Sequence, residues 1–341
     1  MDIKTLCFSL AGANGTSGDE YEACAVAKKA LEEYMTVETD RLGSLVGTIG
    51  DGNFKILLDA HIDRIGLVVR GIDENGFLLV SSVGGVDPRV MVGCEVEVFG
   101  KEKLFGVVCS TPPHLSSKED SEKGVEIKKL AVDVGLSKDE VSKIVELGDR
   151  IVPLSKQLTL LDNRIASPAL DDRCGAAALI LAAEAVHDKL KNCRVSLQLS
   201  SQEEVGGSGA KVAAYNADCD VAIVVDVGFG LDPYCDKTET NELSKGPSIG
   251  LSPTLDRELG KELSKIAKEN NIPYQHDVMS GRTGTNADVI NISRGGVKTA
   301  LLSIPERNMH TPVEVIDLSD VENTAKLIAC YILKKEAELD A

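Results

Sequence analysis

Two kinds of apolar pattern alternate along the second half of the chain. Segments with apolar residues at helical spacing are followed by short, continuously apolar segments, which are typical of buried strands. This alternation predicts an α/β fold with a mixed sheet and helices on both of its faces. The predicted helices lie at 175–187, 207–216, 256–270, 286–292 and 319–335, and the predicted strands at 194–199, 221–225, 274–277 and 298–303.

The beginning of the chain carries the same two patterns. Ser17 and Glu20 form a capping-box pattern, which predicts that a helix begins there. A continuously apolar strand is predicted at 54–60. We therefore expect residues 1–66 to join residues 161–341 in one larger domain.

Between these two parts the pattern changes. Short β-type segments alternate with glycine-containing turns over 67–160, which indicates a small, β-rich inserted domain. Ser137 and Glu140 form a second capping box, which predicts one short helix in this insertion. The polar run at 116–123 is expected to form an exposed loop.

Composition restricts the partners and the location of the protein. The chain has 37 Lys and Arg against 54 Asp and Glu, a net charge of −17, so it would be repelled by nucleic-acid phosphates and anionic lipids. No run approaches the ~20 consecutive apolar residues of a membrane helix, and no signal-peptide pattern is present. The nine cysteines are dispersed without a Cys-x-x-Cys motif, which fits reduced thiols in the cytoplasm.

Acidic residues and histidines recur where the predicted strands end. Glu203 and Glu204 follow the strand at 194–199, and adjacent residues of an extended segment point in different directions. We therefore expect one of these carboxylates to bind a cation and the other to move a proton. The ends of parallel strands are the usual place for the site of an α/β sheet. The other candidates at such positions are His61 with Asp63, Asp171 with Asp172, Asp226, and His310.

Each candidate taken alone has a structural explanation. An isolated Asp after a strand commonly caps the next helix, and a lone buried histidine is usually structural. Convergence of the whole set on one edge of the sheet favours a metal site instead. His114, His187 and His276 have no comparable neighbours, and we expect them to be structural or surface residues.

The residue types indicate divalent metal ions. Carboxylates mixed with imidazoles suit Zn²⁺, Co²⁺ or Mn²⁺ better than Ca²⁺ or Cu⁺. Asp63 stands two positions after His61 and is expected to accept the second ring N–H of that histidine.

Charge balance adds a mechanism to this prediction. Two divalent ions carry four positive charges, and Asp171, Glu204 and Asp226 return three negative charges. One bridging hydroxide would make the site neutral and would also be a suitable nucleophile for a hydrolase. Glu203, outside the ligand set, would act as general base and acid.

Five ordered motifs, spread over almost the whole chain, support this interpretation. They are AHID at 60–63, ALDDRCG at 169–175, EEVG at 203–206, Asp226, and IPERNMHTP at 304–312. The chain resembles the TET, or glutamyl/deblocking, aminopeptidases of peptidase clan MH, some of which were once labelled endoglucanases. The stretches at 83–89 and 112–115 also resemble that family.

The resemblance implies a role for each motif residue. It implies a dinuclear centre, a cis peptide bond between Asp171 and Asp172, and Glu203 as the general base and acid. The ligands would be His61 and Asp226 on one metal ion, Glu204 and His310 on the other, and Asp171 between them.

The resemblance also implies the architecture and the assembly. It implies a phosphorylase/hydrolase-like zinc-peptidase core, with the insertion at 67–160 as a PDZ-like dimerisation domain. Twelve subunits would enclose a chamber whose entrances admit only short peptides. The substrate pocket would be lined by the loop at 281–287, with Arg282, Gly284 and Thr285 as the candidate residues. Arg282 would either favour acidic substrates or be engaged in an ion pair.

Three positions depart from the family's pattern. The chain has Arg64 where an acidic residue is usual, Asn286 where Asp is common, and Asn308 where Tyr is common. None of the three is an expected metal ligand.

The sequence therefore predicts a metallo-aminopeptidase that removes N-terminal residues from short peptides. The alternatives are another dinuclear amidohydrolase, namely a carboxypeptidase or an N-acyl amino-acid deacylase, and a catalytically impaired scaffold. A glycosidase is excluded because a metal ion would occupy one of the two carboxylates that such an enzyme needs. The absence of Trp also leaves few rings on which sugars could stack.

Overall fold

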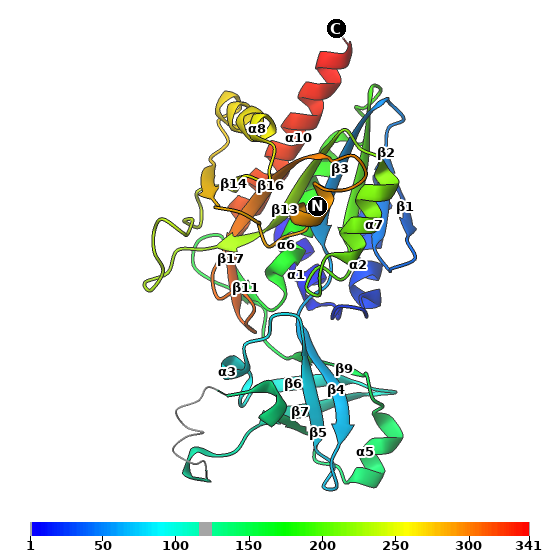
Figure 1. The fold of residues 1–341 in the computed structure, drawn as a ribbon, viewed down its shortest axis with the longest axis vertical. Helices are drawn as coiled ribbons and strands as arrows, with labels where there is room; N and C mark the ends of the chain where they lie inside the picture. Colours follow the sequence, from blue (N-terminus) through cyan, green and yellow to red (C-terminus); the bar gives the residue numbers. More distant parts are fainter. Residues whose placement is uncertain (1, 116–124, 341) are drawn as a thin grey trace.

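The computed structural model describes residues 2–115 and 125–340. It contains a large sheet covered by helices and, below it in Figure 1, a smaller barrel of strands. The loop expected at 116–123 lies outside the described residues. Within the described residues, no helix is long and apolar enough to cross a membrane.

The large sheet is mixed, as predicted. Its four central strands, β12, β3, β13 and β16, are parallel, and β2 and β14 pair antiparallel at their two sides. Its eight strands in spatial order are β1 (Thr36–Thr39), β2 (Leu45–Ile49), β12 (Cys193–Ser200), β3 (Phe54–His61), β13 (Val221–Phe229), β16 (Lys298–Glu306), β14 (Ser248–Leu251) and β15 (Gln275–Val278).

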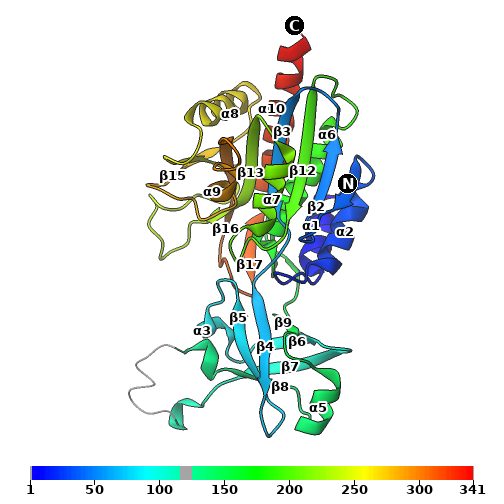
Figure 2. The ribbon, with the colours of Figure 1, turned by 45° about the vertical axis from the view of Figure 1, so that its right-hand side comes forward.

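Helices cover both faces of this sheet (Figure 2). One face packs against α1 (Ile3–Gly12), α2 (Tyr21–Leu31), α6 (Leu170–Val186), α8 (Arg257–Glu269) and α10 (Leu318–Asp340), and the other against α7 (Ser208–Ala217) and α9 (Ala287–Ile290). Alternate residues of β3 pack into the apolar cores on the two faces of the sheet. Ile56 and Leu58 pack on the first face, and Leu57 packs on the α7 and α9 face. By the same alternation, His61 lies on the α7 and α9 face.

The insertion forms a closed barrel with its own apolar core. Its strands in spatial order are β4 (Gly66–Ile72), β5 (Leu78–Val83), β8 (Ala131–Asp133), β7 (Lys103–Cys109), β6 (Glu95–Phe99) and β9 (Arg150–Pro153). The predicted short helix is present as α5 (Lys138–Ile144), where Ser137 and Glu140 form the expected capping box. The remaining turns here are α3 (Pro88–Met91), η1 (Pro113–Leu115) and η2 (Ile127–Lys129).

A three-stranded sheet lies where the chain returns from the barrel. It consists of β10 (Leu158–Thr159), β11 (Arg164–Ser167) and β17 (Glu314–Asp317), in that order and all antiparallel. Since β11 leads directly into α6, this sheet fixes the position at which that helix begins.

The N-terminal prediction was partly wrong. Helix α2 begins at Tyr21 with Glu20 at its N-cap, so Ser17 does not cap it. The Ser17 hydroxyl instead donates a hydrogen bond to the carboxylate of Asp63, a partner 46 positions away that competes with the local cap. Helix α1 was not predicted; Asp2 caps it by accepting the backbone N–H of Thr5.

Candidate metal centre and active site

The ends of the four central strands bring the candidate residues together. His61 is the last residue of β3, Asp226 lies in β13, Glu203 and Glu204 follow β12, and His310 follows β16. Because these strands are parallel, their carboxyl ends meet at one edge of the sheet. Asp171 enters from the start of α6, and its peptide bond to Asp172 is cis, as expected from the resemblance.

Five side chains form two triads that share Asp171. His61, Asp171 and Asp226 form one triad, and Asp171, Glu204 and His310 form the other; in each, three possible ligand atoms lie within 4.8 Å of one another. The His61 Nε2 atom is 3.0 Å from Asp171 Oδ1 and 3.9 Å from Asp226 Oδ1. His310 Nε2 is 3.2 Å from Asp171 Oδ2 and 3.6 Å from Glu204 Oε2. The two oxygens of Asp171 therefore face different triads.

Both histidines are oriented by backbone carbonyl groups. The Nδ1 atom of His61 lies 3.0 Å from the carbonyl oxygen of Asp63, and that of His310 lies 3.1 Å from the carbonyl oxygen of Gly85. A carbonyl can only accept, so each Nδ1 carries a proton, and each Nε2 faces the carboxylate of Asp171, where a metal ion could replace its proton. This arrangement is typical of a histidine that binds a metal ion.

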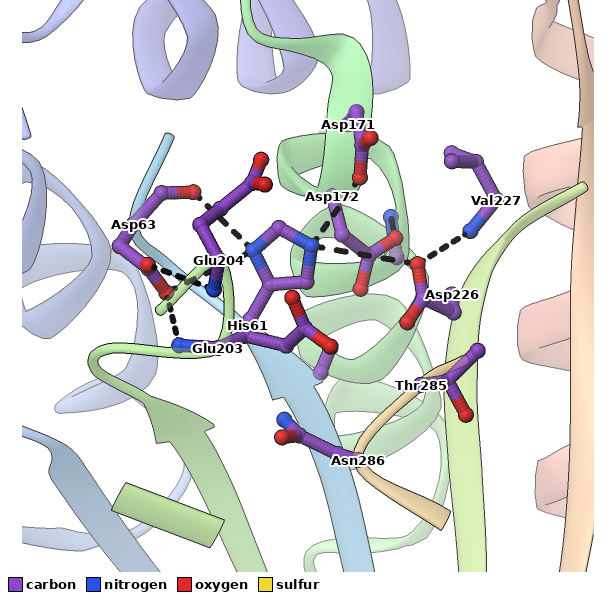
Figure 3. A network of polar contacts seen from close by, with 12 residues as sticks. His61, Asp63, Asp171, Asp172, Glu203, Glu204, Asp226, Val227, Thr285 and Asn286 are labelled. Atoms are coloured by element: carbon purple, nitrogen blue, oxygen red, sulfur yellow. Dashed lines mark hydrogen bonds and ion pairs between the residues drawn. The ribbon is translucent and has the colours of Figure 1, made fainter. Parts of the chain in front are cut away.

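The role of Asp63 differs from the sequence prediction. Its carboxylate was expected to accept the His61 N–H, but Oδ1 is 3.6 Å from Nδ1, and the carbonyl oxygen of Asp63 is the closer partner. The carboxylate accepts instead the backbone N–H groups of Glu203, at 3.0 Å, and Glu204, at 3.2 Å (Figure 3). Asp63 therefore holds the backbone of the glutamate pair.

Asp171 is held by a residue that the sequence did not single out. The carboxylate of Glu314, in β17, accepts the backbone N–H groups of Leu170 at 2.6 Å and of Asp171 at 3.2 Å. Burial works against the charge of Asp171, but hydrogen bonds from His310 and His61 outweigh it and lower the pKa of this carboxyl. No local pattern in the sequence marks Glu314, because its partners are more than 140 positions away.

The other carboxyl groups of the site are crowded and buried. Burial, followed by the charge of Asp171, raises the pKa of Glu204 well above its usual value. Burial likewise raises the pKa of Asp226 and of Glu203. Divalent cations would supply the positive charge that this set of carboxylates lacks. The donor set and the fixed orientations of the two histidines thus fit metal ions of the Zn²⁺, Co²⁺ or Mn²⁺ type.

A pocket of about 790 Å³ opens from the two triads. Its lining includes Glu203, and also Arg282, Gly284 and Thr285, so the structure brings these three pocket candidates together with the metal-ligand candidates. The pocket is thus wide enough for part of a peptide beside the candidate metal centre.

The three departures from the family pattern have different surroundings. Asn286 is buried and donates 2.8 Å hydrogen bonds to Asp59 Oδ2 and to Ser200 Oγ. Arg64 is also buried, near the charges of Glu314 and Glu204. Asn308 lies near the surface in a turn with a φ of 59°. Asp59 was missed by the sequence analysis, although it stands two residues before His61 on the same face of β3.

The comparisons with known proteins agree with this geometry. A family model described as M42 glutamyl aminopeptidase matches residues 43–327. A lysyl aminopeptidase of Pyrococcus furiosus is 36% identical over 297 residues, which are 85% of each chain. The structure of a TET aminopeptidase from a marine-sediment archaeon of the Thaumarchaeota has a TM-score of 0.93 at 32% identity, covering 99% of this chain and 97% of that one.

A third relative is the TET1 peptidase of Pyrococcus horikoshii, which is described as able to assemble into a tetrahedron or a large octahedral shell. Its structure has a TM-score of 0.85 at 31% identity, and the match covers 97% of this chain and 99% of that one. Together with the fold and the site, these comparisons define an aminopeptidase, a hydrolase of the metallopeptidase class. The chain belongs to the M42 glutamyl aminopeptidase family, which confirms the resemblance found in the motifs.

Proposed function

We propose that the protein is a dinuclear metal-dependent aminopeptidase that removes N-terminal residues from short peptides. The observation that carries this proposal is the pair of ligand triads that share Asp171, with Glu203 beside them but in neither triad. His61 and Asp226 would hold one ion, and Glu204 and His310 the other.

The protein's own residues perform the proton transfers. Bound metal ions would polarise the scissile carbonyl group and lower the pKa of water. Glu203 accepts the proton of the attacking water and delivers it to the leaving amine. Burial raises the pKa of Glu203, which makes it a better base than an exposed carboxylate. Asp63 acts through the backbone, by holding the amides of Glu203 and Glu204.

The assembly and the division into domains are part of the same proposal. We take residues 1–66 and 161–341 as the catalytic domain and residues 67–160 as the PDZ-like dimerisation domain. The closed barrel with a separate core supports that division. A homo-oligomer, from a dimer up to a tetrahedral dodecamer, is supported by the assembly described for the Pyrococcus horikoshii relative. The nine free thiols support a cytoplasmic location.

Replacement of Glu203 by Gln tests the assignment of the base. The variant keeps the size of the side chain, so we expect it to bind the same amount of metal and to lose about 10²- to 10⁴-fold in kcat. Glu38→Gln, an exposed glutamate of β1, is the matched control and should retain wild-type activity. Full activity of the Glu203→Gln variant would show that another group is the base.

Product analysis separates the aminopeptidase from the other dinuclear amidohydrolases. A peptide with a free N-terminus and its N-acetylated form are incubated with the metal-loaded protein. We expect release of the first residue from the free peptide only. Cleavage of the blocked peptide alone would instead identify a deacylase, and release of the last residue would identify a carboxypeptidase.

A further inference from the structure

Charged side chains line the pocket unevenly. After Glu203 and the residues of the two triads are set aside, three carboxylates remain in its wall, those of Asp288, Asp277 and Glu239. Arg282 is the only Lys or Arg among the described residues that line the pocket. The wall of the pocket therefore has an excess of negative charge beyond the needs of the metal centre.

Arg282 is engaged by one of these carboxylates. Its Nε atom donates to Asp288 Oδ2 at 3.3 Å, although most of its side chain is exposed. Asp288 is buried and is fixed by the backbone N–H groups of Thr283, at 2.9 Å, and Gly284, at 3.0 Å. The charges of Arg282 and Asp288 thus compensate each other, which favours the ion-pair alternative for Arg282 over recognition of acidic substrates.

The other two carboxylates have no such partner. In the part of the chain that the structure describes, neither Asp277 nor Glu239 makes a side-chain hydrogen bond or an ion pair. Asp277 is half-buried in β15, and this burial raises the pKa of its carboxyl group. Glu239 is exposed and belongs to the loop between β13 and β14. A half-buried carboxylate without a partner is stabilised when a cation binds beside it.

The position of Asp277 suits the end of a long substrate side chain. In the sheet order, β15 is three strands from β13, which carries Asp226 (Figure 2). At the usual spacing between neighbouring strands, this is a separation of about 14 Å. The pocket between them is partly apolar, with Val227, Met279 and Leu301 in its wall. Lys and Arg have apolar stems and charged ends, so they match an apolar passage that ends at carboxylates.

We propose that this pocket selects peptides whose N-terminal residue is Lys or Arg, with Asp277 and Glu239 as the residues that determine this specificity. The inference rests on the proposed function, because it requires the N-terminal amine and the first peptide bond to lie at the metal centre. The side chain of that first residue then extends toward β15.

The proposal is tested by measuring kcat/KM of the metal-loaded protein on four aminoacyl-coumarin substrates. These substrates carry Lys, norleucine, Leu or Glu. Norleucine has the length of the Lys stem without its charge, so the Lys-to-norleucine ratio of kcat/KM isolates the charge. We expect this ratio to be at least about tenfold in the wild type. Asp277→Asn and Glu239→Gln should each lower the ratio, the first by about tenfold, while norleucine hydrolysis persists. Asp188→Asn, exposed beyond the far end of α6, is the matched charge control and should leave the ratio unchanged.

The outcomes separate this inference from the proposed function. Three results would overturn the inference alone. The first is release of norleucine or Leu without a preference for Lys, and the second is a preference for Glu. The third is a Lys-to-norleucine ratio that Asp277→Asn leaves unchanged. Failure to release any of the four residues would contradict the proposed function, and the inference with it. Calorimetric binding of free L-lysine and L-norleucine provides a readout without turnover: lysine should bind more tightly, and Asp277→Asn should remove the difference. Equal binding to the wild type would also overturn the proposal.

Discussion

The carboxylate of Asp63 accepts the backbone N–H of Glu203 at 3.0 Å, across 140 positions of sequence. The second oxygen of Asp63 accepts the backbone N–H of Glu204 at 3.2 Å and the hydroxyl of Ser17. One buried side chain therefore fixes both the proposed base and its neighbour in the second triad. Asp63 can do this only as a double acceptor, because each group that faces it is a donor.

The substitution Asp63→Asn tests this positioning role. The Asn side chain has one acceptor and one donor, so one of the backbone N–H groups would face an N–H group. We expect a loss of about 10- to 100-fold in kcat/KM, together with weaker metal binding, because Glu204 and the backbone carbonyl that orients His61 shift. Activity measured against metal concentration, with metal content measured in parallel, checks the prediction. A variant with wild-type metal affinity and activity would contradict the role given to Asp63.

Asn286 is expected to be required for the stability of this protein because its side chain donates a hydrogen bond to Asp59. The substitution Asn286→Asp would place two carboxyl groups at a buried 2.8 Å contact, at a cost of about 1–3 kcal/mol in the free energy of unfolding. Mutual repulsion raises the pKa of one carboxyl in the folded state above its unfolded value. The folded variant then holds an extra proton at low pH, and its stability falls as the pH rises through that raised pKa.

Urea unfolding at several pH values measures this effect. The swapped double variant, Asp59→Asn with Asn286→Asp, restores one donor and one acceptor at the same contact, so it should recover much of the lost stability. If the double variant is no more stable than Asn286→Asp alone, the contact between the two side chains is not the cause.

Removal of metal ions should lower both activity and thermal stability. The close contact of Asp171 with Glu204 and Asp226 is favourable only when positive charge lies between the carboxylates. At a free metal concentration about 100 times the dissociation constant, the folded state gains about 2.7 kcal/mol. Dialysis against a chelator, followed by calorimetric melting with and without Zn²⁺, Co²⁺ or Mn²⁺, measures the difference. Ca²⁺, which prefers six to eight oxygen ligands, is the control ion and should not restore the stability.

A buried carboxyl outside the site should make stability depend on pH. Asp320 accepts the backbone N–H groups of Ser244 and Gly246, each at 2.7 Å, and burial raises its pKa to about 6. Its folded pKa exceeds the unfolded value, so the folded state binds the proton more tightly. This contribution is fully present below the unfolded pKa of about 3.9 and is lost as the pH rises to about 6.

The substitution Asp320→Asn removes this titration. The variant loses one of the two acceptors at every pH, but it should not show the decline of stability between about pH 4 and pH 6. The difference in the free energy of unfolding between wild type and variant should therefore shrink over that range. A constant difference would mean that Asp320 titrates alike in the folded and unfolded chain.

Local patterns in the sequence were sufficient to predict much of the fold. The alternation of apolar periods predicted the mixed α/β sheet, and the capping box at Ser137 marked α5 because both of its partners lie within one turn. The same pattern at Ser17 failed, since the buried carboxylate of Asp63, in the segment between β3 and β4, accepts the Ser17 hydroxyl. Helix α1 was missed although its buried residues Leu6, Cys7, Leu10 and Ala11 recur at helical spacing.

The sequence by itself determined the chemistry of the site, because each candidate stands at the end of a strand that its own neighbours define. The tertiary structure decided which atoms meet. The backbone carbonyl of Asp63 rather than its carboxylate orients His61, Glu314 holds Asp171, and Arg282 pairs with Asp288 while Asp277 is left without such a partner among the described residues. Most of these relationships join segments that only the packing of the sheet brings together, and hydrogen-bond geometry over a few ångströms selects among partners that the sequence cannot distinguish.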